Sequence, residues 1–267
     1  MGGGKIRHSP FAIRHSPGFT LLELLVVITI IGIMAALSVP ALKNLGKSNV
    51  QVSASRQMLD DIGRARQLAV SQHTTVYMVF VPGIWNLPAN QQTAALTNLL
   101  DKQFTGYNFI SLRSIGDQPG QGTTNYLAEW KSLPDGAFIA LNKFNTAYNY
   151  PYSYNIANYS VSAFATNSFP FPAPTNVTFV LPYVAFNYLG QLTVLTSAGE
   201  AVSTRDEYIP LAQGTVVYAS DPTTKALQFN APDVTENPPG NSTNSMFNII
   251  RIDHLTGRAV QLQQTVQ

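Results

Sequence analysis

The chain of 267 residues contains no cysteine and few charged residues. Without cysteine it can form neither a disulfide framework nor a thiolate metal site, and the sequence does not reveal the redox compartment. Asp, Glu, Lys and Arg make up only 11% of the residues, against roughly 25% in an average soluble domain, while Asn, Thr, Tyr, Gly and Pro are abundant. This composition favours a body rich in β-strands.

A strongly basic character is also missing. The first 18 residues contain Lys5, Arg7 and Arg14 and no acid, and the rest of the chain has 13 basic and 14 acidic side chains. A dedicated nucleic-acid-binding protein would carry a strong basic footprint. We therefore do not expect nucleic acid as a partner.

Catalytic constellations are absent from the sequence as well. His8 and His15 lie in the basic N-terminal segment, and His73 and His254 are far apart, with no helix-spaced partner for a metal site. There is no Gly-x-Ser-x-Gly motif, and the aspartates are scattered through turns, where Asp is common for conformational reasons. We expect a protein that is not an enzyme and that uses no cofactor and no metal.

One long apolar segment stands near the start of the chain. From Leu24 to Leu42 there are 19 consecutive residues without a charge. At ~1.5 Å per residue, a helix of this length approaches the ~30 Å thickness of the hydrocarbon core of a bilayer. Because basic residues precede it, its start should face the cytoplasm and the chain after about Lys43 should be exported.

Glu23 places a carboxylate at the start of this apolar segment. A secretory signal cut after small residues such as Ala36, Ser38 or Ala41 would normally be shorter. A plain signal anchor would tolerate the length but would have no use for the charge. A carboxylate within a bilayer costs on the order of 2.5–3.5 kcal/mol, so Glu23 is a candidate functional residue.

The stretch "Gly18-Phe19-Thr20-Leu21-Leu22-Glu23-Leu24" resembles the cleavage and methylation motif of type IV prepilins and type II secretion pseudopilins. The resemblance implies that residues 1–18 are a leader peptide, that prepilin peptidase cuts between Gly18 and Phe19, and that the new amine of Phe19 is methylated. Residues 19–46 would form a transmembrane helix. In a filament, Glu23 would pair with the amine of a neighbouring subunit, because a helix does not easily let it reach its own.

The same resemblance implies the partners and the location of the protein. The partners are prepilin peptidase, other pilin or pseudopilin subunits, inner-membrane lipid, and a secretion or pilus assembly platform. The chain would cross the bacterial inner membrane once, with residues 47–267 in the periplasm as a pilin-like domain. Pro40, together with Gly32 and Gly46, predicts a break or bend between Ala36 and Gly46, or simply a helix end at the membrane surface.

An amphipathic helix is expected over about residues 50–72. Its apolar face comprises Met58, Leu59, Ile62, Ala65, Leu68 and Ala69, and its charged face comprises Arg56, Asp60, Asp61, Arg64 and Arg66. We interpret the charged face as solvated rather than as a ligand site. The predicted fold is α+β and type IV pilin-like: a long N-terminal helix, transmembrane in its first half, packed on an antiparallel β-sheet body.

The body is expected to alternate strands with turns. Strands are predicted at 75–81, 107–113, 137–141, 177–189, 191–196, 207–211 and 215–219, with a short helix at 90–102 and a final hairpin at 247–253 and 258–262. "Leu133-Pro134-Asp135-Gly136", "Phe186-Asn-Tyr-Leu-Gly190" and "Thr256-Gly257-Arg258" resemble signatures of H-type minor pseudopilins. The chain departs from that family in a long insertion.

The insertion, at about residues 142–176, is rich in Tyr, Asn, Phe and Pro, as in "Tyr148-Asn-Tyr150-Pro-Tyr152-Ser-Tyr154". Such a composition suits an adaptable binding surface, but we favour the simpler interpretation that its aromatics bury against the body or a neighbouring subunit. The leading hypothesis for function is a minor pseudopilin. The alternative is a minor type IV pilin that binds a ligand, a surface or DNA.

Two further candidate sites remain open at this point. A calcium site could form if Asp206, Glu207, Asp221 and Asp233 converge. A small basic patch of Arg251, His254 and Arg258 could contact DNA, as in some minor pilins, although a solvated hairpin is the simpler interpretation.

Overall fold

The computed structural model describes residues 20–85, 87, 91–114, 116–118, 122–149, 152–156, 158–243 and 248–263, without the side chains of residues 36–49. The predicted leader, residues 1–18, and Phe19 therefore lie outside the described residues. The chain forms two compact units, Met1–Gly46 and Lys47–Gln267. The second unit is called the body below.

Helix α1, Leu21–Gln72, contributes to both units and is continuous over 52 residues. The predicted helix end or break between Ala36 and Gly46 was wrong, because the helical backbone runs through Pro40 without interruption. The bend named as the other possibility there stays a prediction. Proline removes one backbone hydrogen bond from a helix, but the bonds on either side can carry the helix past it.

The larger sheet of the body is antiparallel and has eight strands in the order β11-β10-β9-β1-β2-β3, with β4 also paired to β2 and β8 to β9. Its strands are β1 Val76–Phe80, β2 Gly106–Ser111, β3 Asn125–Tyr126, β4 Lys131–Ser132, β8 Ala165–Pro170, β9 Thr178–Phe186, β10 Leu192–Thr196 and β11 Gly199–Val202. Every residue of β1 and β2 is buried, which places these strands at the centre of the body.

A second antiparallel sheet has the order β13-β12-β14-β15, with β5 also paired to β12. Its strands are β5 Ala137–Ile139, β12 Glu207–Val217, β13 Asp233–Glu236, β14 Asn248–Ile252 and β15 Ala259–Gln263. A separate hairpin consists of β6 Tyr154–Ile156 and β7 Tyr159–Val161. Short helical segments are α2 Ala94–Thr97 and the 3-10 helices η2 Leu100–Lys102, η3 Leu141–Phe144 and η4 Thr146–Tyr148.

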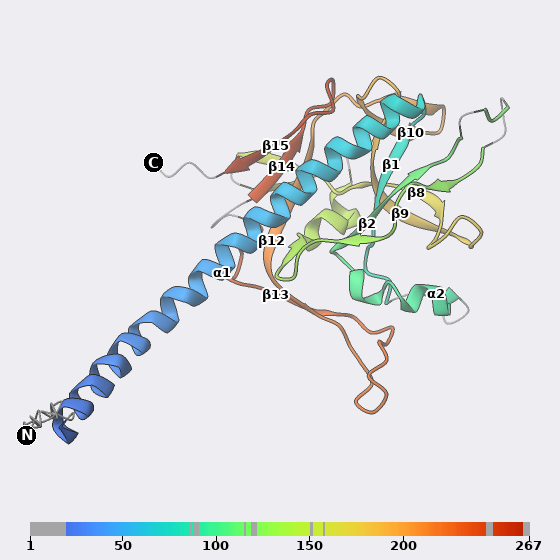
Figure 1. Cartoon of the computed structure of the whole chain (residues 1–267). Coiled ribbons are helices and arrows are strands. Elements are labelled where there is room, and N and C mark those ends of the chain that lie inside the picture. The colour runs from blue at the N-terminus through green and yellow to red at the C-terminus, as the bar shows by residue number, and fades with distance from the viewer. Residues whose placement is uncertain are drawn as a thin grey trace, which may run out of the picture. The chain divides into compact units, whose positions relative to one another are not determined.

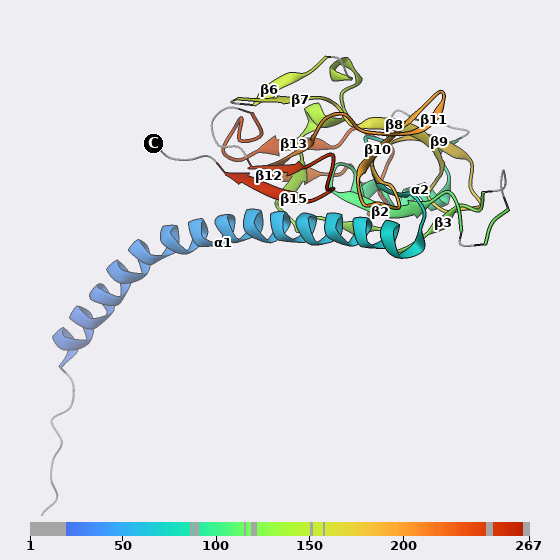
Figure 2. The ribbon, with the colours of Figure 1, turned by 90° about the horizontal axis from the view of Figure 1, so that it is seen from above.

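The part of α1 that belongs to the body lies along one face of both sheets (Figure 1, Figure 2). Met58, Ile62 and Ala65 of the helix are fully buried against Phe109 of β2 and Ile250 of β14, among others. The alternation of side chains along a strand explains how one strand serves two layers. Ile250 and Ile252 of β14 face α1, whereas Ile249 packs on the β6–β7 hairpin.

The opposite face of the larger sheet carries a second core. Tyr77, Phe169 and Tyr183 contact one another edge-on there, and Leu96 and Leu100 of the short helices α2 and η2 cover it. Because both faces are covered, the central strands are apolar on both sides instead of alternating.

The predicted body is largely confirmed by the structure. The α+β class, the antiparallel sheets, the helix over residues 50–72, β1, β2, β9, β10 and the final hairpin all agree with the prediction. Two strands predicted at 207–211 and 215–219 are in fact one strand, β12, which pairs with β14, β5 and β13 along its length. Its middle residues are held in the strand by partners that are distant in sequence.

The insertion at about 142–176 is part of the fold. Its strand β8 pairs with β9 over six residues, and Phe164, Phe169 and Phe171 are buried in the cores. The favoured interpretation, burial of the aromatics against the body, is confirmed for these three residues. Tyr152, in contrast, is 70% exposed.

Candidate functional site

The start of α1 holds the one predicted processing or assembly residue that the structure describes, Glu23. The backbone N–H of Glu23 donates to Thr20 Oγ1 at 3.2 Å, and that of Leu24 donates to the Thr20 carbonyl at 3.1 Å. Thr20-x-x-Glu23 is therefore the N-terminal cap of the helix, with the spacing of a capping box. Gly18 and Phe19, between which cleavage is predicted, lie outside the described residues.

The carboxylate of Glu23 sits in the first turn of α1, where the positive end of the helix dipole favours a negative charge. Glu23 is exposed, as is every residue from Thr20 to Ala35. Glu23 therefore stabilises the start of the helix, and its carboxylate is accessible to a partner from outside the chain.

The apolar side chains of residues 21–35 cover the helix on all sides. Leu21, Ile28, Ile33 and Met34 are among them, and each is more than half exposed. A helix that is apolar around its whole circumference normally buries that surface in a membrane or in other helices.

Among the residues that the structure describes, no helix combines the length and the apolar character needed to cross a membrane. The predicted span Leu24–Leu42 includes residues 36–42, whose side chains lie outside the described residues.

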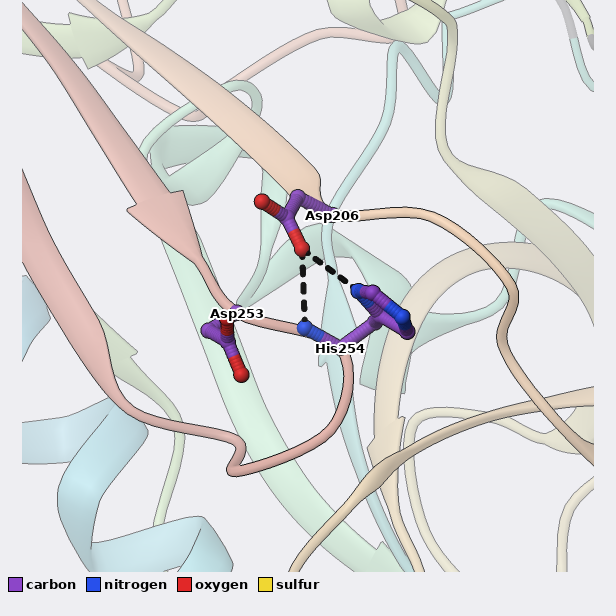
Figure 3. A group of neighbouring side chains, drawn as sticks. All are labelled: Asp206, Asp253 and His254. Atoms are coloured by element: carbon purple, nitrogen blue, oxygen red, sulfur yellow. Dashed lines mark hydrogen bonds and ion pairs between the residues drawn. The ribbon is translucent and has the colours of Figure 1, made fainter.

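A cluster of ionisable side chains in the body comprises Asp206, immediately before β12, and Asp253 and His254, after β14. One ligand-type atom of each lies within 4.8 Å of the others. Figure 3 shows that Asp206 accepts two hydrogen bonds from His254, one from its backbone N–H at 3.0 Å and one involving ring Nδ1 at 2.7 Å. No bond joins Asp253 to either of them in this view.

The second oxygen of Asp206 is bound to Arg251, whose Nε and Nη2 both lie 2.7 Å from Oδ2. Burial opposes ionisation of Asp206, but the hydrogen bonds from His254 and Arg251 and the Arg251 charge together lower its pKa. Asp253 accepts hydrogen bonds from the backbone N–H and the hydroxyl of Thr256, and these two bonds lower the pKa of Asp253 as well. Since these oxygens already have partners and a guanidinium lies beside them, we interpret the cluster as a structural clasp between β12 and the final hairpin.

The two other candidate sites from the sequence do not form among the described residues. Of the proposed calcium ligands, Asp206 binds Arg251 and His254, Glu207 pairs with Lys143, and Asp221 accepts hydrogen bonds within its own turn. Asp233 lies exposed on β13. For the final hairpin the structure favours the simpler interpretation of a solvated hairpin over a basic patch, because Arg251 and His254 converge on Asp206 while Arg258 is exposed.

The three signature glycines meet α1 in the body. Gly136, Gly190 and Gly257 all have positive φ, of 91°, 78° and 62°, and a side chain at Gly190 would collide with Arg66 at 2.9 Å. A Cβ on Gly257 would lie 2.0 Å from the Gly190 carbonyl oxygen. Arg66 Nε donates to the carbonyls of Gly190 and Thr256, so the helix joins two turns that are far apart in sequence.

The charged face of α1 is not simply solvated, as the sequence suggested. Asp61 is buried, accepts a hydrogen bond from Tyr107 at 2.6 Å and forms an ion pair with Lys131 at 2.6 Å. Burial and the bond to Asp61 raise the pKa of Tyr107. Asp61 and Arg66 therefore attach the helix to the sheet and loops, which a helical-wheel pattern could not show because their partners come from distant segments.

A fully buried lysine anchors the insertion, and sequence reasoning missed it. Lys143 is 1% exposed, donates to the Ser162 carbonyl at 2.7 Å, forms an ion pair with Glu207 and lies 4.6 Å from the centre of the Phe164 ring. Burial lowers its pKa, although Glu207 opposes the shift. The only hint in the sequence was that Lys143 is the last charge before the uncharged stretch that ends at Gly199.

The profile of one protein family, described as the prokaryotic N-terminal methylation motif, matches residues 13–39. This motif indicates a type IV pilin-like or pseudopilin protein, a class that is in general processed by prepilin peptidase, anchored in the membrane and equipped with a periplasmic domain. The match covers the predicted cleavage site and Glu23 but none of the body. No curated protein and no solved structure matches the chain significantly.

Proposed function

We propose that the chain is a minor pseudopilin of a type II secretion filament, processed by prepilin peptidase between Gly18 and Phe19 and assembled through its N-terminal helix. The observation that carries the proposal is the methylation motif at residues 13–39, with Glu23 exposed in the first turn of a helix whose residues 21–35 are mostly apolar and all exposed. In this proposal residues 19–46 remain in the inner membrane and the body lies in the periplasm.

Assembly depends on the charge of Glu23. Within lipid an unpaired carboxylate is costly, and the methylated amine of Phe19 on a neighbouring subunit would neutralise it. A subunit that docks in the wrong register leaves the charge unpaired, so the pair selects the correct register.

The turns at Gly136, Gly190 and Gly257 support the H-type assignment, because the three signature motifs all lie where the body packs on α1. At Gly190 and Gly257 the close approach of Arg66 and of the Gly190 carbonyl gives the motif a structural reason that is independent of local turn preference.

The assembly role is tested by separating the charge of Glu23 from its place in the helix cap. Glu23→Gln keeps a residue suited to the capping box, whereas Thr20→Ala removes the cap and keeps the charge. We expect Glu23→Gln and Glu23→Ala to be processed normally but to enter filaments about 10- to 100-fold less, as for the loss of a charged hydrogen-bonded pair. Thr20→Ala should assemble nearly normally.

Assembly of Glu23→Gln at the wild-type level, or a loss of membrane insertion with normal assembly, would contradict this role. Processing has its own test, the mass of the mature N-terminus. Gly18→Val should leave uncut precursor, whereas a mature chain that starts at Leu37, Val39 or Leu42 would indicate ordinary secretion instead.

A minor type IV pilin with a ligand-binding role is the second candidate. A polar cavity beside the insertion favours it, and the pairing of Arg251 and His254 with Asp206 argues against the DNA-binding form. Deletion of residues 145–176 is not a clean test, because β8 and three buried phenylalanines belong to that segment. Point substitutions in the cavity are needed instead.

A further inference from the structure

A polar cavity of about 420 Å³ lies beside the β6–β7 hairpin, in a part of the body that the assembly motif does not use. Three segments line it: the hairpin and its flanks with Ser153, Ser160 and Ser162, the residues at and just before the start of β12 with Arg205, Asp206, Glu207 and Tyr208, and His254 of the final hairpin. Its volume falls in the range of roughly 300–1,000 Å³ that is usual for small-molecule sites. Figure 2 shows the β6–β7 hairpin on the side of the body opposite α1.

The carboxylates at this cavity are already paired with cations of the protein. Asp206 is held by Arg251 and His254, and Glu207 by the buried Lys143. A metal ion would have to displace these partners. A charged ligand of either sign would meet like charge in the lining, because the two carboxylates stand beside Arg205, which donates to Ser162 Oγ at 3.0 Å. The charge arrangement therefore favours a neutral, polar ligand.

The serines supply hydroxyls that can both donate and accept hydrogen bonds. Ser153 Oγ and Ser160 Oγ lie 2.6 Å apart, and only one hydroxyl can donate to the other. The second O–H can therefore donate away from the pair, while both oxygens keep accepting capacity. Both serines are exposed, so a ligand can reach them. A ligand rich in hydroxyl groups would match this mixture of donors and acceptors.

Aromatic side chains stand beside these hydroxyls. Tyr208 lines the cavity, and the Tyr159 ring lies 5.7 Å from it at an interplanar angle of 39°. An aromatic ring next to polar groups suits a ligand with an apolar C–H face and a polar rim. Nearby, Tyr154 Oη is buried with no hydrogen-bond partner in the described part of the chain, and its pKa is raised by burial and then by the charge of Glu207.

We propose that this cavity binds a neutral saccharide, with the Ser153–Ser160 pair bonding its hydroxyls and Tyr208 packing against a sugar ring. The site is independent of the proposed assembly role, since none of its residues lies in residues 19–46. The insertion then has two parts: β8 and the phenylalanines complete the body, and the tyrosine- and serine-bearing hairpin forms one wall of a binding site.

The test is saturation-transfer NMR on the full chain with maltose, cellobiose and N,N′-diacetylchitobiose as probes. The detergent must not have a sugar headgroup, because such a detergent would itself compete. We expect saturable transfer to at least one of these probes. In Ser160→Val, the loss of a hydroxyl should weaken binding by about 3- to 10-fold, as for one net hydrogen bond.

The matched control is Ser168→Val, because Ser168 is also an exposed serine on a β-strand but lies outside the cavity. It should bind like the wild type, and both variants should keep the wild-type melting temperature. No transfer from any probe at millimolar concentrations, or equal binding by Ser160→Val and the wild type, would overturn the proposal. Neither outcome would affect the processing and filament assays, so the two proposals fail separately.

Discussion

The two halves of α1 differ in the exposure of their apolar side chains. Residues 21–35 expose Leu, Ile, Val and Met around the whole helix, whereas in residues 50–72 Met58, Ile62, Ala65 and Ala69 are fully buried against two sheets. The first half needs an apolar environment from outside the chain; the second half finds one within the body. One continuous helix can thus join a segment suited to a membrane or filament to a segment that is part of a folded core.

The largest loss of stability is expected when a charged side chain is placed in the buried half of α1. Ile62→Asp should destabilise the body by more than ~4 kcal/mol, because it places an unpaired carboxylate among fully buried side chains. Ile31→Asp, on the exposed half, should leave the unfolding of the body unchanged and reduce retention in the membrane. Thermal unfolding of both variants in detergent, with fractionation of cells, distinguishes them; equal unfolding behaviour would remove the distinction between the halves.

A smaller loss of stability is expected for substitutions in the two glycine turns that Arg66, in the buried half, binds. Gly257→Ala should lower the free energy of unfolding by about 2–4 kcal/mol, since its Cβ would lie 2.0 Å from the Gly190 carbonyl oxygen and φ is +62°. Gly199→Ala is the control, because Gly199 also has positive φ but open space around it. Denaturant unfolding that shows equal losses for the two variants would mean that backbone strain, and not the contact, is responsible.

The clasp at Asp206 should make the stability of the body depend on pH. The folded pKa of Asp206 is lowered, so its contribution is complete above the unfolded value of about 3.8 and is lost as pH falls through the folded pKa. Asp206→Asn should cost about 1.5–3 kcal/mol at neutral pH, as for hydrogen bonds to a charged group. Urea unfolding at several pH values should show a weaker acid dependence in the variant; an unchanged dependence would contradict the clasp.

The smallest expected effect is a gain in stability of the body from a Gly→Ala substitution in α1, and only the buried half of the helix should show it. Gly32 and Gly63 both lie in α1 with no atom within 4 Å of an added Cβ. Gly63→Ala should raise the free energy of unfolding of the body by about 0.5–1 kcal/mol, because alanine loses less entropy in a helix. Gly32→Ala, in the other unit, should leave it unchanged, and a gain from both substitutions in denaturant unfolding would show that the two units unfold together.

Local patterns in the sequence were sufficient for the elements with strong periodicity or strong turn signals. The amphipathic spacing of residues 50–72 gave the buried face correctly, and the turn residues between Ile252 and Ala259 located the final hairpin. The prediction failed where distant partners decide. Asp61 was assigned to a solvated face, but Tyr107 and Lys131, from other elements, bury it and bind it.

Among the candidate sites, too, those set by neighbouring residues were predictable and those set by distant residues were not. The methylation motif was predictable because its chemistry is local: a small residue, an aromatic and an acid at fixed positions in one segment. The clasp of Asp206, Arg251 and His254 was not, because opposite charges about 50 residues apart in sequence are brought together only by the pairing of β12 with β14. The proposed calcium site also failed, since Asp206 and Glu207 pair with different cations, Asp221 bonds within its own turn and Asp233 lies exposed on β13.

The sequence by itself therefore determined the N-terminal motif, the apolar helix that follows it and the α+β class of the body, because these depend on the order and spacing of neighbouring residues. Only the tertiary structure decided that Lys143 is buried, that three glycine turns meet α1, and that serines of the insertion face a polar cavity. These features depend on contacts between segments far apart in the chain, and such contacts are specified by packing and charge pairing in three dimensions.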